Sequence, residues 1–373
     1  MKKITILTMQ LKKFGGIERF VTTLAEMLAP NNEVTVVANY GKRKDELAFE
    51  MPKNVKVEFL APEQPKEVSM KAILTRREFG KIPAELKRRF KINRERKNAI
   101  KTYFDKLDTD VIITERATYN KLIGKYYHGS AKLIATDHNF HQNQPKYIRK
   151  LIKSIKKFDY LVVATQELYD FYRDRIKAKC ICIANALTTI PEKKAELNTK
   201  NVIAAGRFYP EKDFVTLVDV MAKVHQRDEK IKLFLIGDGP ERAAIEKKIE
   251  QAGLKKTIIL TGALSQEEIA TYYYQSSLFV MTSITEAFGL VLAEAMSYGL
   301  PVVAFDRASG ARAQISEDVG VLIRNVDAEE MAEKIIELLK NGTQLKKYQT
   351  NIGQKIKQYS KEAIRQDWAK IIQ

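Results

Sequence analysis

Cysteine, histidine and tryptophan are scarce in this 373-residue chain, and their scarcity excludes several kinds of protein. Two cysteines cannot form the disulfide framework of a small secreted domain. The four histidines, at positions 128, 138, 141 and 225, do not have the spacing of zinc ligands. Cys180 and Cys182 alternate with isoleucines in a strand-like segment, so we interpret them as reduced core thiols of a cytoplasmic protein.

Long hydrophobic runs are also missing. No segment of the sequence approaches the ~20 consecutive apolar residues that a transmembrane helix needs. The first nine residues look like the start of a signal peptide, but Lys12 and Lys13 end the apolar stretch too early. We therefore expect these residues to form the first strand of the fold.

Short apolar segments alternate with helical patterns along the whole chain, which predicts an α/β protein with parallel sheets covered by helices. One series of strand-like segments comprises residues 4–7, 34–37, 55–60, 111–113, 132–135 and 160–163, and a second comprises 202–205, 232–236, 257–260, 278–281, 301–304 and 320–323. The polar stretch 188–200 between them is the expected linker. We predict two Rossmann-like domains facing a cleft, with ligands beyond the carboxyl ends of the strands.

One carboxylate stands out in the second series. Glu294 is the only charged residue between Ala287 and Phe305, so an apolar helix carries a single acidic side chain. Burying an ionised carboxylate without partners is costly, and we expect Glu294 to accept hydrogen bonds from a ligand diol. The helix should begin near Phe288 or Gly289, where free backbone N–H groups offer an anion site. A ligand that carries both hydroxyls and phosphate would use all of these groups, and a sugar nucleotide is such a ligand.

Three motifs resemble those of retaining glycosyltransferases of family 4. Glu286 and Glu294, separated by seven residues, resemble the paired-glutamate motif of that family. The segment 206–214, with Arg207 and Lys212, resembles its Gly-Arg…Lys-Gly segment, and Gly15-Gly16 resembles its amino-terminal Gly-Gly loop. The motifs occur in the order and spacing of the family, and the resemblance covers nearly the whole chain.

The resemblance implies the GT-B fold and a set of site residues. It places the acceptor domain at residues 1–187, joined by 360–373, and the nucleotide-sugar domain at 188–359. The catalytic residues that it implies are His138, Arg207, Lys212 and Glu286. The donor-binding residues are Gly15, Gly16, Arg207, Lys212, Gly237, Glu286, Phe288, Gly289, Leu290 and Glu294.

The resemblance also implies the chemistry. Glu286 would contact the hydroxyls of the donor sugar, and Glu294 those of the ribose, while Arg207 and Lys212 would neutralise the leaving diphosphate. We expect a UDP-sugar donor, retention of anomeric configuration, no cofactor and no metal. Asp108-Thr109-Asp110 has the form of a metal-binding Asp-x-Asp pair, but it precedes a strand, at the edge opposite to the expected site.

Some features leave alternatives open. His141 competes with His138 for the role of the histidine near the reacting sugar. Gly237, in a Gly-x-Gly segment, would border the nucleobase or only form a turn at the start of a helix. Glu115-Arg116 follows a strand and is a candidate for the acceptor side. After Gly310 the family often has a glutamate, whereas this chain reads Ala-Arg-Ala-Gln, so a local contact is expected to differ.

The formal net charge of +18 is concentrated locally. Residues 71–101 contain twelve Lys or Arg and three Glu, with Phe79, Ile82, Leu86 and Phe90 at helical spacing; residues 146–157 contain six basic residues and no acidic ones. Basic amphipathic helices are typical of membrane surfaces, and we expect peripheral binding at the inner face of the cell membrane. The apolar stripes could instead face the core.

Two further functions remain as alternatives to a transferase acting on a cell-surface glycan or lipid-linked acceptor. One is a noncatalytic partner subunit of a related glycosyltransferase. The other is nucleic-acid binding, which the basic charge permits but no recognition motif supports, so no nucleic-acid partner is expected.

Overall fold

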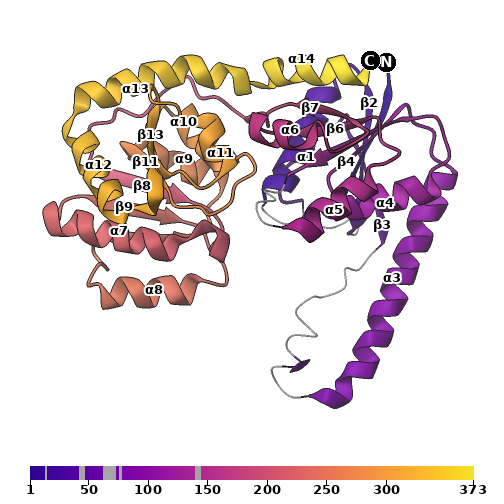
Figure 1. The fold of residues 1–373 in the computed structure, drawn as a ribbon, viewed down its shortest axis with the longest axis horizontal. Helices are drawn as coiled ribbons and strands as arrows, with labels where there is room; N and C mark the ends of the chain where they lie inside the picture. The colour runs from indigo at the N-terminus through magenta and orange to yellow at the C-terminus, as the bar shows by residue number, and fades with distance from the viewer. Residues whose placement is uncertain (13–14, 42–46, 62–72, 75–77, 139–143) are drawn as a thin grey trace. The chain divides into compact units, whose positions relative to one another are not determined.

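The computed structural model of the protein consists of two α/β units (Figure 1). Unit 1 contains residues 1–163, 169–183 and 365–373, and unit 2 contains residues 164–168 and 184–364. The structure describes all residues except 13–14, 42–46, 62–72, 75–77 and 139–143.

Unit 1 is built on a seven-stranded sheet in the order β3-β2-β1-β4-β5-β6-β7. Its strands are β1 (Lys3–Thr8), β2 (Glu33–Tyr40), β3 (Lys56–Ala61), β4 (Val111–Thr114), β5 (Lys132–Asp137), β6 (Tyr160–Val163) and β7 (Lys179–Cys182). Its helices are α1 (Gly16–Leu28), α3 (Ile82–Asp105), α4 (Ala117–Tyr126), α5 (Pro145–Ser154), α6 (Gln166–Tyr172) and the end of α14 (Lys361–Ile372), with a 3-10 turn η1 (Phe79–Lys81) before α3.

Unit 2 is built on a six-stranded sheet in the order β10-β9-β8-β11-β12-β13. Its strands are β8 (Asn201–Ala205), β9 (Lys232–Ile236), β10 (Ile258–Gly262), β11 (Leu278–Met281), β12 (Val302–Phe305) and β13 (Gly320–Ile323). Its helices are α7 (Phe214–Arg227), α8 (Arg242–Gln251), α9 (Gln266–Tyr274), α10 (Leu290–Ser297), α11 (Ser309–Gln314), α12 (Ala328–Lys340) and α13 (Gly342–Lys355), with 3-10 turns η2 (Pro210–Lys212), η3 (Arg324–Val326) and η4 (Ile356–Tyr359).

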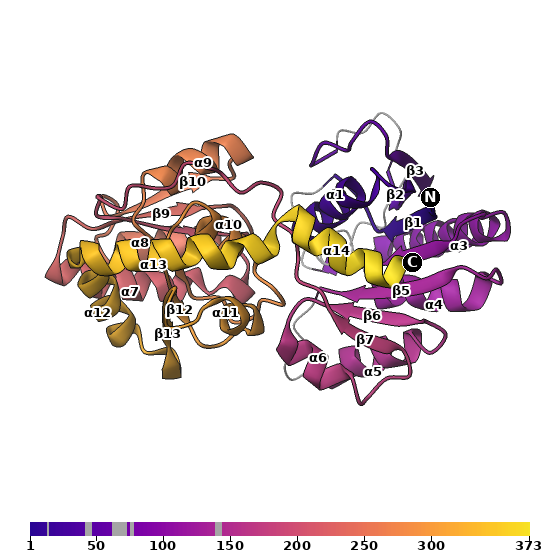
Figure 2. The ribbon, with the colours of Figure 1, turned by 90° about the horizontal axis from the view of Figure 1, so that it is seen from above.

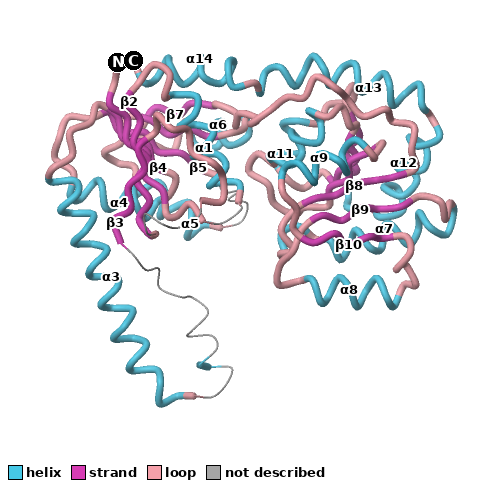
Figure 3. The backbone as a smooth tube through the Cα atoms, turned by 180° about the vertical axis from the view of Figure 1, so that it is seen from behind, coloured by secondary structure: helices cyan, strands magenta, loops and turns pink. Residues whose placement is uncertain are grey.

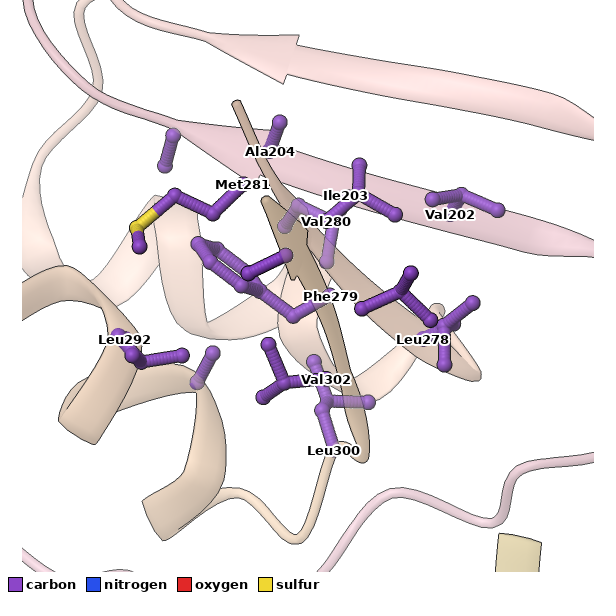
Figure 4. Packing of buried hydrophobic residues seen from close by; sticks show 14 of the residues in the cluster. Val202, Ile203, Ala204, Leu278, Phe279, Val280, Met281, Leu292, Leu300 and Val302 are labelled. Atoms are coloured by element: carbon purple, nitrogen blue, oxygen red, sulfur yellow. The ribbon is translucent and has the colours of Figure 1, made fainter. Parts of the chain in front are cut away.

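The strand pairings described in both sheets are parallel. Figure 3 shows the strands in magenta. Strands buried on both faces need apolar residues at every position, which explains why they occur in the sequence as continuous apolar runs. In unit 2, β8, β11 and β12 contribute Ile203, Phe279 and Val302 to one core, and Leu292 of α10 packs against it (Figure 4). The sequence-based prediction of two parallel-sheet domains is confirmed.

Each sheet has one position where the strand order reverses. In unit 1 the chain begins at β1, moves outward to β2 and β3, and then returns to β4 on the other side of β1. In unit 2 the same reversal lies between β8 and β11. The connections leave such a pair of strands in opposite directions, so a crevice opens at their carboxyl ends, and ligands of open α/β sheets bind there.

The interpretation of both cysteines as core thiols was wrong for one of them. Cys180 is buried, and burial raises the pKa of its thiol to about 12. Cys182 is exposed, because it ends β7, the outermost strand of the unit 1 sheet.

The last helix carries the single tryptophan of the chain into unit 1 (Figure 2). Trp368 is 1% exposed, and its ring centroid lies 6.4 Å from that of Phe20 in α1. Lys132 donates a hydrogen bond of 2.9 Å to the carbonyl of Ile371. Unit 1 therefore has the end of the chain as part of its core.

Replacing Trp368 with alanine should destabilise unit 1 by about 3–5 kcal/mol, because the substitution leaves a large cavity among packed side chains. Urea unfolding followed by circular dichroism measures the change. Lys370→Ala on the same helix is the matched control, since the Lys370 side chain is 73% exposed and pairs with Asp367 on the surface. Equal unfolding midpoints for the two variants would contradict the packing described for Trp368.

Candidate active site

The strand reversal of unit 2 brings together the motif residues of the second half of the chain. Arg207 and Lys212 follow β8, and Glu286 follows β11, the strand hydrogen-bonded to β8. Residues that are about 75 positions apart therefore meet at one edge of the sheet.

The turn after β8 is fastened to the loop after β11. The hydroxyl of Thr282 donates to the carbonyls of Lys212 and Asp213, at 3.1 and 3.0 Å, and the Ile284 N–H donates to the Glu211 carbonyl at 2.8 Å. Asp213 has a positive φ of 52°, and its carboxylate accepts a hydrogen bond of 2.7 Å from Arg307. These contacts fix the direction in which Lys212 leaves the backbone.

Lys212 and Glu286 form an ion pair at this edge. Their side chains are only 15% and 12% exposed, and the Ser283 hydroxyl donates to the same Glu286 oxygen at 3.1 Å. A partly buried pair of this kind is costly to break on one side only, because the remaining charge loses its partner. The pair therefore holds an ammonium group and a carboxylate in fixed positions, ready to contact an anion and hydroxyl groups.

Arg207 is more accessible than Lys212. Its side chain is 58% exposed, lies 4.9 Å above the ring of Tyr209, and is 3.8 Å from the Glu211 carboxylate. No buried partner holds it among the contacts described for it, so the guanidinium can turn toward a ligand phosphate, which it could bind through two parallel hydrogen bonds.

The loop before α10 is held by its backbone. Gly310 N–H and the Ser309 hydroxyl donate to the Glu286 carbonyl at 3.0 and 3.1 Å. The fully buried side chain of Gln314 donates to the carbonyl of Phe288, and its nitrogen is 3.4 Å from the carbonyl of Gly289. The chain's departure from the family pattern after Gly310 thus places a glutamine amide against this loop.

Gly289 allows α10 to begin next to Glu286. It has φ +81°, a conformation that favours glycine, and it caps the helix that starts at Leu290. The first N–H groups of a helix have no partner within the helix, so those of α10 are directed to this edge of the sheet. The Phe288 ring packs against Tyr359 at 5.3 Å, which leaves only its backbone for a ligand.

Glu294 follows Leu290 by four residues on α10, so both belong to one side of the helix. It is half-buried, whereas its neighbours Ala293 and Ala295 are fully buried. The carboxylate therefore leaves the apolar core on the side where the helix has some accessible surface, as expected for a group that contacts a ligand.

Gly237 follows β9, the strand next to β8. The structure gives a packing reason for a glycine at this position. It has φ +140°, and a Cβ atom there would lie 1.9 Å from the carbonyl oxygen of Gly206. Gly239 packs equally closely on the backbone of Phe208. The Gly-x-Gly segment lets the turn after β9 pass against the turn that carries Arg207, whether or not it borders a nucleobase.

Unit 1 gathers its motif residues at its own strand reversal. Gly15 and Gly16 lie at the start of α1, after β1, and Glu115 and His138 follow β4 and β5. Glu18, in the first turn of α1, is nearly buried, and a Cβ atom on Gly15 would lie 2.5 Å from its carboxylate. A phosphate at this helix end would need cations to offset the charge of Glu18.

Glu115 is a buried carboxylate beside this reversal, with 2% exposure. It accepts hydrogen bonds of 3.0 Å from the Thr8 hydroxyl and the Met9 N–H, and Arg116 pairs with its other oxygen at 3.0 Å. Burial raises the pKa of Glu115, while Arg116 opposes that shift. These contacts hold Arg116, whose side chain is 44% exposed, near the ends of β1 and β4.

The surroundings of His138 favour a neutral imidazole. Burial, followed by the positive charge of Arg116, lowers its pKa to about 4, so the imidazole is neutral near pH 7. The Thr136 hydroxyl donates its proton to the Thr114 carbonyl at 3.0 Å and is 2.9 Å from His138 Nε2. The single hydroxyl proton is used in that bond, so the Thr136 oxygen accepts a hydrogen bond from the Nε2–H of His138. This assigns the imidazole proton to Nε2 and leaves Nδ1 as an acceptor. His141 lies outside the described residues.

The Asp-x-Asp segment lies at the opposite edge of the unit 1 sheet, as predicted. Asp108 pairs with Lys3, and Asp110 accepts a hydrogen bond of 2.8 Å from the Lys3 N–H at the start of β1. A cavity of about 630 Å³ opens there, lined among others by Glu58, Tyr103 and Asp108. None of the candidate site residues lines this cavity.

The supporting roles of Thr282, Ser283 and Ser309, which help to hold the turn and loop that carry Lys212 and Glu286, were not predicted from the sequence. These three residues follow buried strands within a few positions, as many other polar residues do. For Gln314 the sequence predicted only that a contact after Gly310 would differ, and not that the amide would donate to the Phe288 carbonyl.

Comparisons with known proteins agree with this geometry. Residues 188–359 match the family described as glycosyl transferases group 1. An exopolysaccharide phosphotransferase of Streptomyces coelicolor is 25% identical over 99% of this chain, which spans only 40% of that protein. The amylovoran biosynthesis glycosyltransferase AmsD of Erwinia amylovora is 26% identical over the full length of both chains.

Among solved structures, a mutant of S. aureus TarM in complex with fondaparinux, alpha-GlcNAc-glycerol and UDP has a TM-score of 0.80 over 100% of both chains, with 17% identity. The chain has the GT-B fold. The predicted fold and the resemblance to GT-B glycosyltransferases are thereby confirmed, and a glycosyltransferase of group 1 is the enzyme class that the comparisons support.

The pKa of His138 predicts how acid affects stability. The native pKa of about 4 is below the ordinary value of 6.5, so between these values the unfolded chain binds a proton that the native chain does not. The contribution of His138 to stability is therefore complete above about pH 6.5 and is lost as the pH falls toward about 4. Urea unfolding should show that wild type loses more stability than His138→Gln between about pH 7 and about pH 5.

A ¹H NMR titration provides an independent readout of the same group. The His138 ring signal should shift with a midpoint below pH 5. A midpoint near 6.5 would show that the imidazole is hydrated and would remove the assignment of a neutral ring.

Proposed function

We propose that this chain transfers a sugar from a UDP-sugar to a hydroxyl of a cell-surface glycan or lipid-linked acceptor, with retention of anomeric configuration. The observation that carries the proposal is the Lys212–Glu286 pair at the β8/β11 strand reversal, beside the start of α10 and Glu294. Cations, backbone N–H groups and carboxylates there match the diphosphate and hydroxyls of a sugar nucleotide.

Each residue has a role in this proposal. Arg207 and Lys212 neutralise the diphosphate, with the backbone N–H groups of Gly289 and Leu290, while Glu294 accepts hydrogen bonds from the ribose hydroxyls. Glu286 accepts them from the donor sugar. For His138 and the Gly15-Gly16 loop of unit 1 we propose contacts with the donor sugar and its phosphate, as the family resemblance implies.

The proposed reaction needs no nucleophile from the protein. The bond between the sugar C1 and the diphosphate oxygen breaks, and the acceptor oxygen bonds to C1 on the same face. The acceptor proton passes to the leaving diphosphate, whose growing charge Lys212 and Arg207 stabilise. We propose that no metal or other cofactor takes part, because Lys212 is held at this edge by Glu286 and the exposed Arg207 can turn toward the same charge.

The relatives support the choice of substrates. The structure of the S. aureus TarM mutant contains UDP and alpha-GlcNAc-glycerol, and the relative from Erwinia amylovora is named for amylovoran biosynthesis. We propose the same classes of donor and acceptor here, with the enzyme in the cytoplasm at the inner face of the membrane. In the described part of the chain, every helix is too short or too polar to cross a bilayer.

A second candidate function comes from the match to an exopolysaccharide phosphotransferase, which covers 99% of this chain. A transfer of sugar phosphate would break the bond between the two phosphates and release UMP. A transfer of the sugar alone would release UDP.

The proposal is tested with a panel of UDP-, GDP- and ADP-sugars, scored for donor hydrolysis and for the nucleotide released. One UDP-sugar should be turned over to UDP, and Lys212→Ala and Glu294→Ala should each lower the rate about 10²–10³-fold. Lys223→Ala is the control, because Lys223 pairs with Glu329 on the surface of the same unit. It should retain the wild-type rate.

Other outcomes would contradict parts of the account. Release of UMP would favour the phosphotransferase, and no binding of any donor would indicate a noncatalytic partner subunit. An inverted anomeric configuration in the ¹H NMR spectrum of the product would exclude the proposed same-face mechanism.

A further inference from the structure

The two halves of α3 have different surroundings. Its carboxyl-terminal half covers unit 1, with Ile100 fully buried and Phe104 4% exposed. Ile92 packs against Tyr40 and Ala61, the last residues of β2 and β3. The helix residues before Ile92 therefore lie beyond the carboxyl edge of the sheet, over about 15 Å of helix. Figures 1 and 3 both show α3 continuing past the end of β3.

The projecting half of α3 and the 3-10 turn η1 before it carry large apolar side chains in water. Phe79 in η1 is 59% exposed, and Leu86 and Phe90 in α3 are 54% and 70% exposed. Positions 86 and 90 are one helical turn apart, so Leu86 and Phe90 follow one side of the helix, and Phe79 lies in the turn that precedes it. We call this stripe, together with the basic residues around it, the α3 ridge (residues 79–94).

The charges of the α3 ridge are predominantly positive. Its acidic residue Glu85 is already paired with Arg88 and Arg89, at 2.8 and 2.9 Å, and Glu78 just before it pairs with Lys81. Lys87, Lys91 and Arg94 are exposed, and the nearest carboxylate described for Lys91 is Glu95 at 3.9 Å. An exposed apolar stripe bordered by cations is complementary to a surface with negatively charged groups on the outside and apolar material below them.

The second basic helix shows that composition alone does not produce this surface. In α5 the apolar stripe faces the core, with Leu151 1% exposed and Ile155, just after the helix, also 1% exposed. The lysines of α5 lie on the opposite side of the helix, which is exposed to solvent. The sequence-based alternative of a core-facing stripe is thus correct for α5 and wrong for the first half of α3, where the helix extends beyond the sheet that would cover it.

We propose that the α3 ridge binds the surface of an anionic lipid bilayer, with Phe79, Leu86 and Phe90 inserted at the boundary between head groups and acyl chains. Two contributions act together, because burial of the apolar side chains adds to the attraction between the basic residues and anionic lipid. The ridge projects at the edge of unit 1 where Glu115 and His138 lie.

Membrane binding does not require the proposed transferase activity. A second inference does rest on that function: the bilayer would bring a lipid-linked acceptor to the carboxyl edge of the unit 1 sheet.

The test is flotation of the full chain with vesicles of phosphatidylglycerol and phosphatidylcholine in equal parts, and with phosphatidylcholine alone. We expect binding to the anionic vesicles. Phe79→Ser and Phe90→Ser should each lower the partition coefficient about tenfold, and Lys87→Glu and Lys91→Glu at least about fivefold each. Arg149→Glu and Lys153→Glu on α5, each made singly, are the matched controls for charge and should have much smaller effects.

Circular dichroism shows that each variant is folded, which we expect because the substituted side chains are exposed. Equal losses for the α3 and α5 variants, or no binding to anionic vesicles, would overturn the proposal. So would sedimentation showing a dimer that Phe90→Ser dissociates in the absence of vesicle binding, since the stripe would then join two copies of the chain. Hydrolysis of a water-soluble donor should be unchanged in the α3 variants, so failure of membrane binding is distinguishable from failure of the transferase proposal.

Discussion

The partly buried ion pair of Lys212 and Glu286 is the interaction on which the candidate site depends. It joins the turn after β8 to the loop after β11, two segments that the chain brings together only because the strand order reverses between them. Thr282, Ser283 and the backbone of Ile284 reinforce the same junction. A cation that is already positioned needs little reorganisation when charge develops on a leaving group, which is how fixed charges accelerate reactions.

The same constraint explains the positions of the other candidate residues. Gly289 can begin α10 beside Glu286 only because its φ is positive, and Ser309 and Gln314 hold the carbonyl groups of that loop. Gly237 contributes by letting one turn pass closely against another. In unit 1 the reversal between β1 and β4 gathers a second polar group, with a neutral His138 and a buried Glu115.

Sequence patterns predicted the parallel sheets well, because strands buried on both faces must be apolar at nearly every position. They also placed Arg207, Lys212 and Glu286 correctly at strand ends, where α/β proteins bind ligands. The supporting contacts could not be predicted. Thr282 and Gln314 reach partners 70 and 26 positions away, and nothing near either residue in the sequence indicates those partners.

The helices show a second limit of sequence. The basic helices α3 and α5 have similar composition, but one stripe is exposed and the other buried, because exposure depends on how far a helix extends beyond its sheet. Cys182 was misplaced for a related reason, since the alternation of a strand does not reveal that the strand lies at the sheet edge and that the residue ends it.

The central claim is that a nucleotide diphosphate binds unit 2 at the β8/β11 reversal. Amide hydrogen exchange measured with and without UDP tests it most directly. The account predicts slower exchange in residues 206–213 and 282–294 when UDP is present, because these backbone segments surround the proposed site. Binding of UDP with no protection in either segment would contradict it.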